Sequence, residues 1–246
     1  MFLWGVFATG AVWPLLDFFL GRRAAFKIQE MIRRNWCATV CRILNIDVET
    51  VGEPCPETRL WVSNHISWLD IIALGARHPL LFVAKIEVAD WPVMGYLARR
   101  IGTLFVRRGD AEQTTLIVEQ MAWQLRQGRQ LMLFPEGTTT NGERVLRFHA
   151  KFLQPAQLAH VPVQAIALEY LGQARTVAPF IGEDEFLPHL INIFKLDRIP
   201  LRVHYCPPLA SGQHRDAFAQ TTRKQVVAAL FAKDEAELPK VGNAAN

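Results

Sequence analysis

The sequence predicts an α/β fold, with a mixed sheet of roughly seven strands flanked by helices and preceded by an N-terminal two-helix membrane motif. Three observations support this prediction. The 246 residues suffice for one large domain with a sizeable core. Short β-type runs recur along the chain, with helical stretches between several of them. Half of the residues are apolar, and the excess over an average soluble protein gathers at the N-terminus.

The first element is an apolar segment, Phe2 to Leu20, in which Thr9 and Asp17 are the polar side chains. About 20 apolar residues suffice to cross the hydrocarbon core of a bilayer. Pro14 and Asp17 disfavour a spanning helix, so a helix that lies in one leaflet is an equal alternative. Basic residues follow this segment instead of preceding it, which argues against a secretory signal and predicts that the main domain faces the cytoplasm. These residues are Arg22, Arg23, Lys27, Arg33 and Arg34.

The second element, over residues 24–44, mixes apolar and basic side chains in the manner of an interfacial amphipathic helix. The alternative is a helix packed on the protein core. We expect the two elements to form membrane-anchoring helices over residues 1–51. Two prolines and a glycine between residues 52 and 58 mark the boundary to an α/β domain over residues 52–246.

The strands and helices of this domain are predicted from local patterns. Strands are expected over residues 59–63, 80–84, 103–107, 130–134, 161–170, 175–180 and 201–205. A helix is expected over residues 114–127, where Ile117, Met121 and Leu125 recur at a spacing of four and Gly128 can end the helix. A last helix is expected over residues 216–232.

Composition and charge exclude several classes of protein. With 50% apolar and 20% charged residues, the chain is neither disordered nor collagen-like. The net charge of +4 suits an anionic membrane surface or a phosphate-bearing substrate, and is too small to indicate nucleic acid binding. The four cysteines lack zinc-ligand spacing, so we expect reduced, mostly structural thiols.

The first candidate site follows the predicted strand over residues 59–63, where Asn64 and His65 are followed by Asp70 and an apolar run typical of a helix. Residues that follow strands in α/β sheets project into the crevice where ligands bind. Asp70, in the first helical turn, can reach back to the imidazole of His65, fix its tautomer and stabilise its charged form. The pair would then be a general base. Ser67 and Asp70 also match a capping box, in which Asp70 would serve only the helix N-terminus.

The second candidate site is the turn Phe134-Pro-Glu-Gly-Thr-Thr139, which follows another predicted strand. Proline and glycine favour a tight turn whose backbone N–H groups can hold an anionic head group, and the threonines add donors. Arg107 and Arg108 follow a third strand and carry the kind of charge that recognises phosphate. A plain structural turn and a solvated strand end are the alternatives. Because all three sites follow β-type runs, we expect them along one edge of the sheet.

Four sequence blocks resemble, in the same order, those of the glycerolipid acyltransferases. They are Asn64-His65 with Asp70, Gly102-Thr-Leu-Phe-Val-Arg-Arg108, Phe134-Pro-Glu-Gly-Thr138 and Val161-Pro-Val163. Each block alone is a weak signal, but the set is specific and spans roughly residues 55–210. The chain is most similar to the bacterial 1-acyl-sn-glycerol-3-phosphate acyltransferases and the lyso-ornithine lipid O-acyltransferases.

The resemblance implies an enzyme that moves a fatty acyl group from acyl-CoA or acyl-carrier protein to the free hydroxyl of a lysolipid, with no cofactor and no metal. His65 would be the general base and Asp70 would orient it, with no acyl-enzyme formed. The site for the acceptor would consist of Asn64, Arg108, Glu136, Gly137 and Thr138. The implied location is the cytoplasmic face of the bacterial inner membrane. Its partners would be membrane lipids and the acyl donor, and no nucleic acid.

Two differences from the family pattern concern the acceptor. Members that form phosphatidic acid usually carry arginine after Phe-Pro-Glu-Gly-Thr, where this chain has Thr139, and the usual Phe-Lys-Lys-Gly is replaced by Phe148-His-Ala-Lys151. Both differences shift or remove positive charge from a phosphate site. The leading acceptor is 1-acyl-sn-glycerol-3-phosphate, the commonest in the family. Lyso-ornithine lipid or another lysophospholipid is the alternative.

Two other functional classes are weighed against this one. A serine hydrolase would use Ser67 with His65 and Asp70, although the chain has no Gly-x-Ser-x-Gly motif. A non-catalytic membrane-binding module would have a buried His65 and would use Asp70 only as a helix cap. The histidines other than His65 lack metal-binding spacing and are assigned no chemistry.

Overall fold

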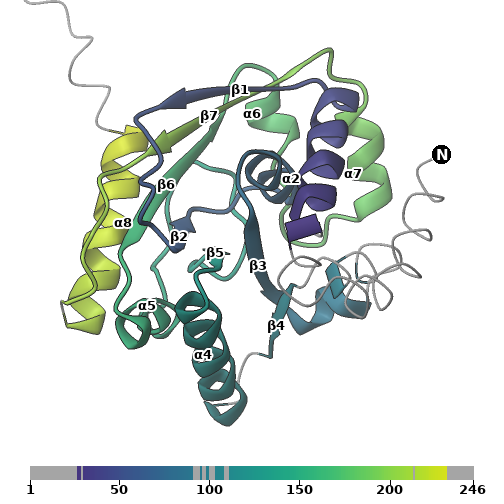
Figure 1. Ribbon diagram of the computed structural model, residues 1–246. Coiled ribbons are helices and arrows are strands. Elements are labelled where there is room, and N and C mark those ends of the chain that lie inside the picture. The colour runs from purple at the N-terminus through teal and green to yellow at the C-terminus, as the bar shows by residue number, and fades with distance from the viewer. Residues whose placement is uncertain are drawn as a thin grey trace, which may run out of the picture.

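A seven-stranded mixed sheet forms the centre of the protein, and helices cover both of its faces (Figure 1). The computed structural model describes residues 27–28, 30–90, 95, 98–99, 103–107, 111–212 and 214–231. The strands lie in the order β1-β7-β6-β2-β5-β3-β4. This arrangement confirms the predicted α/β class and its mixed sheet. The strands are β1 (Ile46–Val51), β2 (Leu60–Ser63), β3 (Leu80–Lys85), β4 (Leu104–Val106), β5 (Gln130–Leu133), β6 (Val163–Tyr170) and β7 (Ile199–Tyr205).

Strand direction fixes which loops meet. The central strand β2 pairs in parallel with β5 on one side and with β6 on the other. β3 pairs in parallel with β5 and with β4, whereas β7 runs antiparallel to β6 and parallel to β1. The carboxyl ends of β2, β5 and β6 therefore lie at one edge of the sheet, where open α/β sheets bind their ligands.

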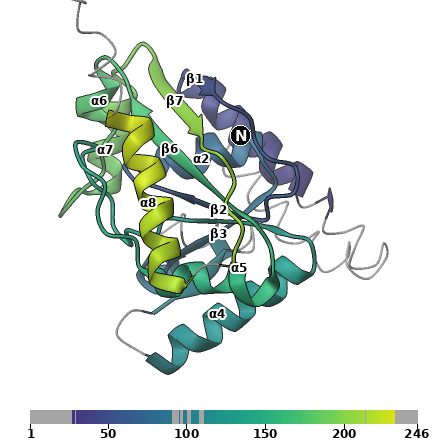
Figure 2. The same ribbon diagram turned by 90° about the vertical axis from the view of Figure 1, so that its left-hand side faces the viewer.

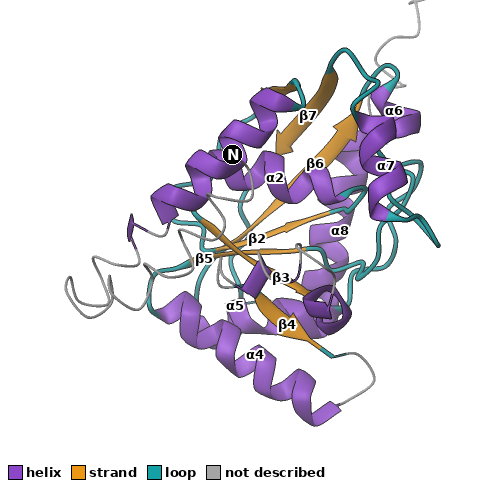
Figure 3. Ribbon diagram, turned by 90° about the vertical axis from the view of Figure 1, so that its right-hand side faces the viewer, coloured by secondary structure: helices purple, strands orange, loops and turns teal. Residues whose placement is uncertain are grey.

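The helices form a layer on each face of the sheet. α4, α5 and α8 cover one face (Figure 2), and α2, α6, α7 and the helix over residues 30–43 cover the other (Figure 3). The helices are α2 (Trp68–Arg77), α4 (Ala111–Arg126), α5 (Gln154–Ala159), α6 (Ala174–Val177), α7 (Phe186–Ile193) and α8 (Arg215–Phe231), with 3₁₀ helices η1 (Ile86–Asp90) and η2 (Ala150–Leu153). The helices predicted over residues 114–127 and 216–232 are α4 and α8.

The two faces of the sheet bury separate hydrophobic clusters. Successive residues of a strand point to opposite faces, so Leu60 and Trp61 of β2 belong to different clusters. Leu60 packs in the cluster that includes Met121 of α4 and Phe218 of α8. Trp61 packs in the cluster that includes Leu69 of α2. β2 is therefore buried on both sides. It supports the turn that follows it, which carries Asn64 and His65.

The helix over residues 30–43 packs on the body of the protein. Cys37, Val40 and the following Leu44 are buried in the same cluster as Trp61. The inner face of this helix therefore matches the core-packing alternative. The exposed side chains of this helix, among them Ile43 at 57%, form its outer face. Contact of this outer face with a membrane stays a prediction.

Two elements differ from the prediction. Ile46–Val51, which was assigned to the anchor, is strand β1, and its alternating apolar and polar residues suit an edge strand with one face on the protein. The sheet thus begins at Ile46. The strand predicted over residues 175–180 is wrong, because Ala174–Val177 forms helix α6. Ala174 and Ala178 are both fully buried, and their spacing of four places them on one helical face.

The predicted membrane segment, Phe2 to Leu20, lies outside the described residues. Among the residues that the structure does describe, no helix combines the length and the apolar character needed to cross a bilayer. The two-helix membrane motif stays a prediction, whereas the pairing of β1 with β7 places residues 46–51 in the sheet of the α/β domain.

Candidate active site

The turns that follow β2 and β5 lie side by side, because these strands are parallel neighbours. The imidazole of His65, after β2, stacks on the ring of Phe134, after β5, with ring centroids 3.8 Å apart and an interplanar angle of 13°. The backbone N–H of Thr140 donates to the carbonyl of His65 at 2.8 Å. The prediction that the two motifs meet at one sheet edge is confirmed.

His65 and Asp70 form a hydrogen-bonded pair. His65 Nδ1 lies 2.8 Å from Asp70 Oδ2. A carboxylate only accepts hydrogen bonds, so Nδ1 carries the hydrogen and Nε2 of the neutral ring keeps its lone pair. The His65 side chain is 18% exposed, whereas that of Asp70 is fully buried. The ring thus has a fixed tautomer and the electronic form of a general base.

Three further donors hold the Asp70 carboxylate. Its Oδ2 accepts the backbone N–H groups of Ile66 at 2.8 Å and Ser67 at 3.0 Å. Its Oδ1 accepts the hydroxyl of Tyr170 at 2.8 Å. Burial and the neighbouring carboxylate raise the pKa of Tyr170 well above its usual value, so this hydroxyl remains a donor. Asp70 therefore serves both the imidazole and the start of α2. We call Asp70 and its four donors the Asp70 clamp.

Glu136 fixes the backbone of His65 from the second motif. Its Oε1 accepts the backbone N–H of His65 at 3.1 Å, and its Oε2 accepts that of Leu146 at 3.0 Å. Burial raises the pKa of Glu136, while the two backbone hydrogen bonds and nearby His65 oppose that shift. Both oxygens of this predicted acceptor-binding residue are engaged with the protein, so Glu136 positions the base.

Asn64 ties the end of β2 to β6. Its side chain is buried, its Nδ2 donates to the carbonyl of Leu168 at 2.9 Å and its Oδ1 accepts the Leu168 N–H at 2.8 Å. The amide thereby continues the pattern of a β-ladder beyond the last strand residue. Asn64, also predicted to bind the acceptor, uses both polar groups of its side chain in this way.

The turn after β5 presents the remaining predicted residues. Gly137 donates its N–H to the carbonyl of Phe134 at 2.9 Å and has a φ of 69°, which favours glycine. Thr138 is exposed beyond this turn. The hydroxyl of Thr139 donates to the carbonyl of Phe180. Gly137 and Thr138 therefore border the surface next to the His65–Phe134 stack.

The arginine block lies further along the sheet. Arg107 is exposed after β4, and β5 and β3 separate β4 from β2 in the sheet order. Arg108 and Gly102 lie outside the described residues. Their place near the acceptor stays a prediction.

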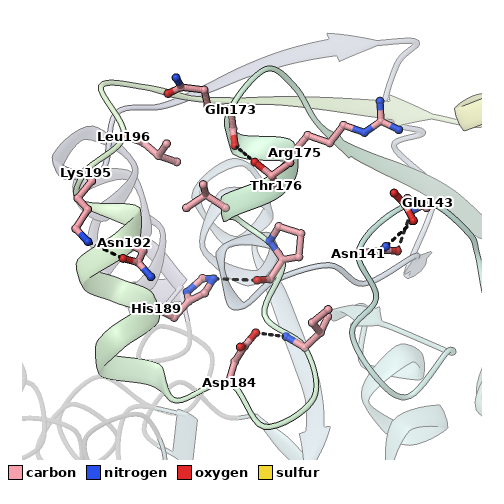
Figure 4. A pocket seen from close by; sticks show the side chains of 13 residues that line it. Asn141, Glu143, Gln173, Arg175, Thr176, Asp184, His189, Asn192, Lys195 and Leu196 are labelled. Carbon is pink, nitrogen blue, oxygen red and sulfur yellow. Dashed lines mark hydrogen bonds between the residues drawn. The ribbon is translucent and has the colours of Figure 1, made fainter.

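A pocket of about 770 Å³ lies beside the two motifs, between α6, α7 and the loop over residues 141–143 (Figure 4). We call it the α6–α7 pocket. His65 does not line it, but Phe180, between the lining residues Pro179 and Ile181, donates its N–H to the carbonyl of Ile66 at 2.9 Å. One wall of the pocket is therefore bonded to the turn that carries the base.

His189, to which the sequence analysis gave no role, joins this wall to α2. Its Nδ1 accepts the indole N–H of Trp68 at 3.1 Å. Its Nε2 lies 3.1 Å from the carbonyl of Pro179 (Figure 4). A neutral ring protonated at Nε2 satisfies both contacts. No sequence spacing links residues 68 and 189, so this contact could be found only in the folded chain.

The hydrolase alternative finds no support in the position of Ser67. Ser67 is fully buried at the start of α2. A nucleophile must reach the substrate, and the partly exposed ring of His65 is the group that can do so. As for metals, the described part of the chain contains no group of three or more His, Cys, Asp or Glu side chains that could hold an ion.

Comparison with known proteins agrees with this site. Residues 47–169 match the protein family described as Acyltransferase. A lyso-ornithine lipid O-acyltransferase of Pseudomonas aeruginosa is 40% identical, and the alignment covers 93% of this chain and 91% of the relative's chain. A 1-acyl-sn-glycerol-3-phosphate acyltransferase of Neisseria meningitidis is 30% identical over 81% of this chain and 80% of its own.

A solved structure shares the fold. The crystal structure of a 1-acyl-sn-glycerophosphate acyltransferase of Thermotoga maritima superposes with a TM-score of 0.66 at 20% identity, covering 94% of this chain and 90% of that one. This likeness supports the seven-stranded architecture that places the two motifs side by side.

Proposed function

Because the chain belongs to the glycerolipid acyltransferase family and is thus an acyltransferase of lysolipids, we propose that it moves a fatty acyl group from acyl-CoA or acyl-carrier protein to the hydroxyl of lyso-ornithine lipid. The hydrogen bond between His65 Nδ1 and Asp70 Oδ2 carries this proposal. It leaves Nε2 as the base on a partly exposed ring.

The transfer takes place in one exchange between acceptor and donor. His65 Nε2 takes the proton of the acceptor hydroxyl as its oxygen attacks the thioester carbonyl, so that a C–O bond forms. Asp70 stabilises the imidazolium through Nδ1. The C–S bond then breaks, the thiolate leaves, and it takes the proton from Nε2 to become the free thiol. A thiol is acidic enough to leave readily, so no acyl-enzyme is required.

Two observations support lyso-ornithine lipid, the acceptor that the sequence analysis placed second. The Pseudomonas aeruginosa relative that bears this name covers nearly the whole chain. Thr139, at the position where phosphatidic-acid-forming members usually carry arginine, has its hydroxyl bonded to the carbonyl of Phe180. The second candidate acceptor is 1-acyl-sn-glycerol-3-phosphate, which would give phosphatidic acid. The Neisseria meningitidis relative favours it.

The predicted site residues divide into two groups. We propose that Arg108, Gly137 and Thr138 contact the acceptor. Asn64 and Glu136 act through the turns they hold, since their polar atoms bond to the backbone.

We place the reaction at the cytoplasmic face of the bacterial inner membrane, where a lysolipid acceptor would be available. The basic residues after Phe2 to Leu20 support this orientation. Exposed apolar side chains on α7 and at its C-cap add surface suited to a lipid interface. They are Leu187, Ile191 and Phe194.

The test is to incubate the purified protein with acyl-CoA or acyl-carrier protein and one lysolipid at a time, while recording thiol release and product mass. We expect turnover with lyso-ornithine lipid. His65→Ala should reduce it by about 100- to 10,000-fold while the protein stays folded, because a positioned base is lost. Ser67→Ala is the control for the hydrolase mechanism and should keep most of the activity.

Turnover with 1-acyl-sn-glycerol-3-phosphate and none with lyso-ornithine lipid would reject the proposed acceptor. Parental turnover in His65→Ala would reject the mechanism itself.

A further inference from the structure

The α6–α7 pocket is large and is lined by side chains of both charges. Its volume of about 770 Å³ lies in the range of ligand-binding pockets. Arg175 and Lys195 bring positive charge to its lining, and Glu143 and Asp184 bring negative charge. The pocket therefore offers equal numbers of cationic and anionic side chains.

These four charged side chains form no ion pairs with one another or with other described residues. Three make short-range hydrogen bonds instead. Lys195 Nζ donates to Asn192 Oδ1 at 2.8 Å, Glu143 Oε2 accepts the amide of Asn141 at 2.7 Å, and Asp184 Oδ2 accepts the N–H of Ile181 at 2.7 Å (Figure 4). These hydrogen bonds position the three side chains in the pocket lining. Because their partners are neutral groups, the charges are not compensated.

The walls of the pocket are continuous with the catalytic turns. Phe180, between the lining residues Pro179 and Ile181, accepts the hydroxyl of Thr139 and donates its N–H to Ile66. Thr140, bonded to the His65 carbonyl, directly precedes the lining residue Asn141. A lipid whose polar end occupies the pocket would therefore extend from a wall that is shared with the base.

We propose that the α6–α7 pocket binds the zwitterionic amino-acid head group of the acceptor lipid, a subsite that rests on the proposed function. Arg175, which lies on the same side of the pocket as Glu143, would take the carboxylate of the head group, and Glu143 would take its ammonium group (Figure 4). Opposite charges at separate points of a pocket recognise a zwitterion and fix its direction. His189 links two parts of the structure, because it contacts Trp68 of α2 and the carbonyl of Pro179 in the pocket lining.

The same charges disfavour a phosphate monoester. A phosphate that carries close to two negative charges would gain from Arg175 and Lys195 but would meet the carboxylates of Glu143 and Asp184. An amino-acid head group offers one charge of each sign to this lining. The pocket thus offers a physical reason for preferring a zwitterionic acceptor over an anionic one.

The experiment measures binding and turnover separately. Binding of a short-chain lyso-ornithine lipid to His65→Ala is measured by titration, so that no product forms, and the pocket changes are then added one at a time. Arg175→Gln and Glu143→Gln should each weaken binding by about five- to tenfold, the loss of one charge-assisted contact at an accessible site. Arg215→Gln and Glu119→Gln, on the opposite helical layer, are matched controls and should leave the affinity unchanged.

Modified lipids assign the charges. The methyl ester of the acceptor lacks the carboxylate and should bind equally to the parent and Arg175→Gln. The Nδ-acetylated acceptor lacks the ammonium group and should bind equally to the parent and Glu143→Gln. Unchanged affinity of the unmodified lipid for both variants overturns the pocket proposal. Absence of turnover in the parent overturns the proposed function, and the binding result is independent of it.

Binding of free Nα-acetylornithine is the last measurement, because this compound carries the same two charges without a long acyl chain. We expect it to bind much more weakly than the lipid. Equal affinity would mean that the pocket takes a free amino acid derivative and would reject the head-group assignment.

Discussion

The hydroxyl of Tyr170 donates to Oδ1 of Asp70 at 2.8 Å, from the last residue of β6 to the first turn of α2. Tyr170 is buried, and it is the donor of the Asp70 clamp that reaches the carboxylate from a different part of the fold. The orientation of the His65–Asp70 pair therefore depends on a residue far outside either motif.

Tyr170→Phe should slow catalysis and weaken the fold. The ring is kept, but the buried carboxylate loses a partner, which costs about 1–3 kcal/mol of unfolding free energy. We expect kcat to fall several-fold while the KM for the acceptor stays constant, because Tyr170 acts through Asp70. Steady-state kinetics and urea unfolding measure the two effects. A parental kcat with reduced stability would show that Tyr170 supports only the fold.

Asp70→Asn should separate the two roles of Asp70. An amide can still accept hydrogen bonds, but it cannot stabilise the imidazolium, so we expect kcat to fall on the order of 1,000-fold. Its unfolding free energy should fall as well, because a neutral oxygen caps α2 less well. His65→Ala should match the rate loss with a smaller loss of stability. Equal activity of Asp70→Asn and the parent would reduce Asp70 to a helix cap.

Phe134→Ala should make the orientation of the His65 imidazole less fixed and so lower the rate. The Phe134 ring covers one face of the His65 imidazole at 3.8 Å between centroids, and its removal leaves the imidazole free to tilt. We expect a lower kcat, with recovery in Phe134→Tyr, which keeps the stack. Single-turnover thiol release compares the three proteins. Equal rates for Phe134→Ala and Phe134→Tyr would contradict a positioning role for the stack.

His78 should make the fold acid-sensitive. Burial, followed by the nearby Arg77 and Arg34, lowers the pKa of His78 from 6.5 to about 4. Its ring stacks on Trp61 and its Nε2 lies 2.7 Å from the hydroxyl of Tyr205. The folded protein keeps His78 neutral, whereas the unfolded chain takes up a proton near pH 6.5. The contribution of His78 to stability is thus complete above pH 6.5 and is lost as the pH falls toward 4.

His78→Gln should therefore flatten the dependence of unfolding free energy on pH in this window. Urea unfolding at pH 7, 5.5 and 4.5 measures it, with His214→Gln, at an exposed histidine, as the control. An equally steep decline in His78→Gln would assign the acid sensitivity to other groups.

The sequence motifs identified the residues that carry out the chemistry better than the residues that hold them in position. His65 and Asp70 could be paired from their spacing, because the strand and the first helical turn around them are local structures. Asn64 and Glu136 were found by the same motifs but expected to touch the acceptor. Their hydrogen bonds to Leu168 and Leu146 depend on tertiary contacts that no local pattern reveals. Tyr170 was missed for the same reason.

The fold shows the same division. The buried strands of the sheet were predictable from continuous β-type runs. β1 was missed because it follows a helix that was assigned to the anchor, and only its pairing with β7 identifies it as part of the sheet. The segment over residues 175–180 has β-branched and apolar residues, but burial of Ala174 and Ala178 against the core overrides that local preference.

The Asp70 clamp also has a consequence for the order in which activity appears during folding. Asp70 is separated by 100 residues from Tyr170, and Asn64 by 104 residues from Leu168. Contacts of such long range form late, after the chain has closed large loops. A ribosome-bound chain from which β6 has not yet emerged would possess both motifs and still lack an oriented base. Competence for acyl transfer would thus arise only after β6 has joined the sheet.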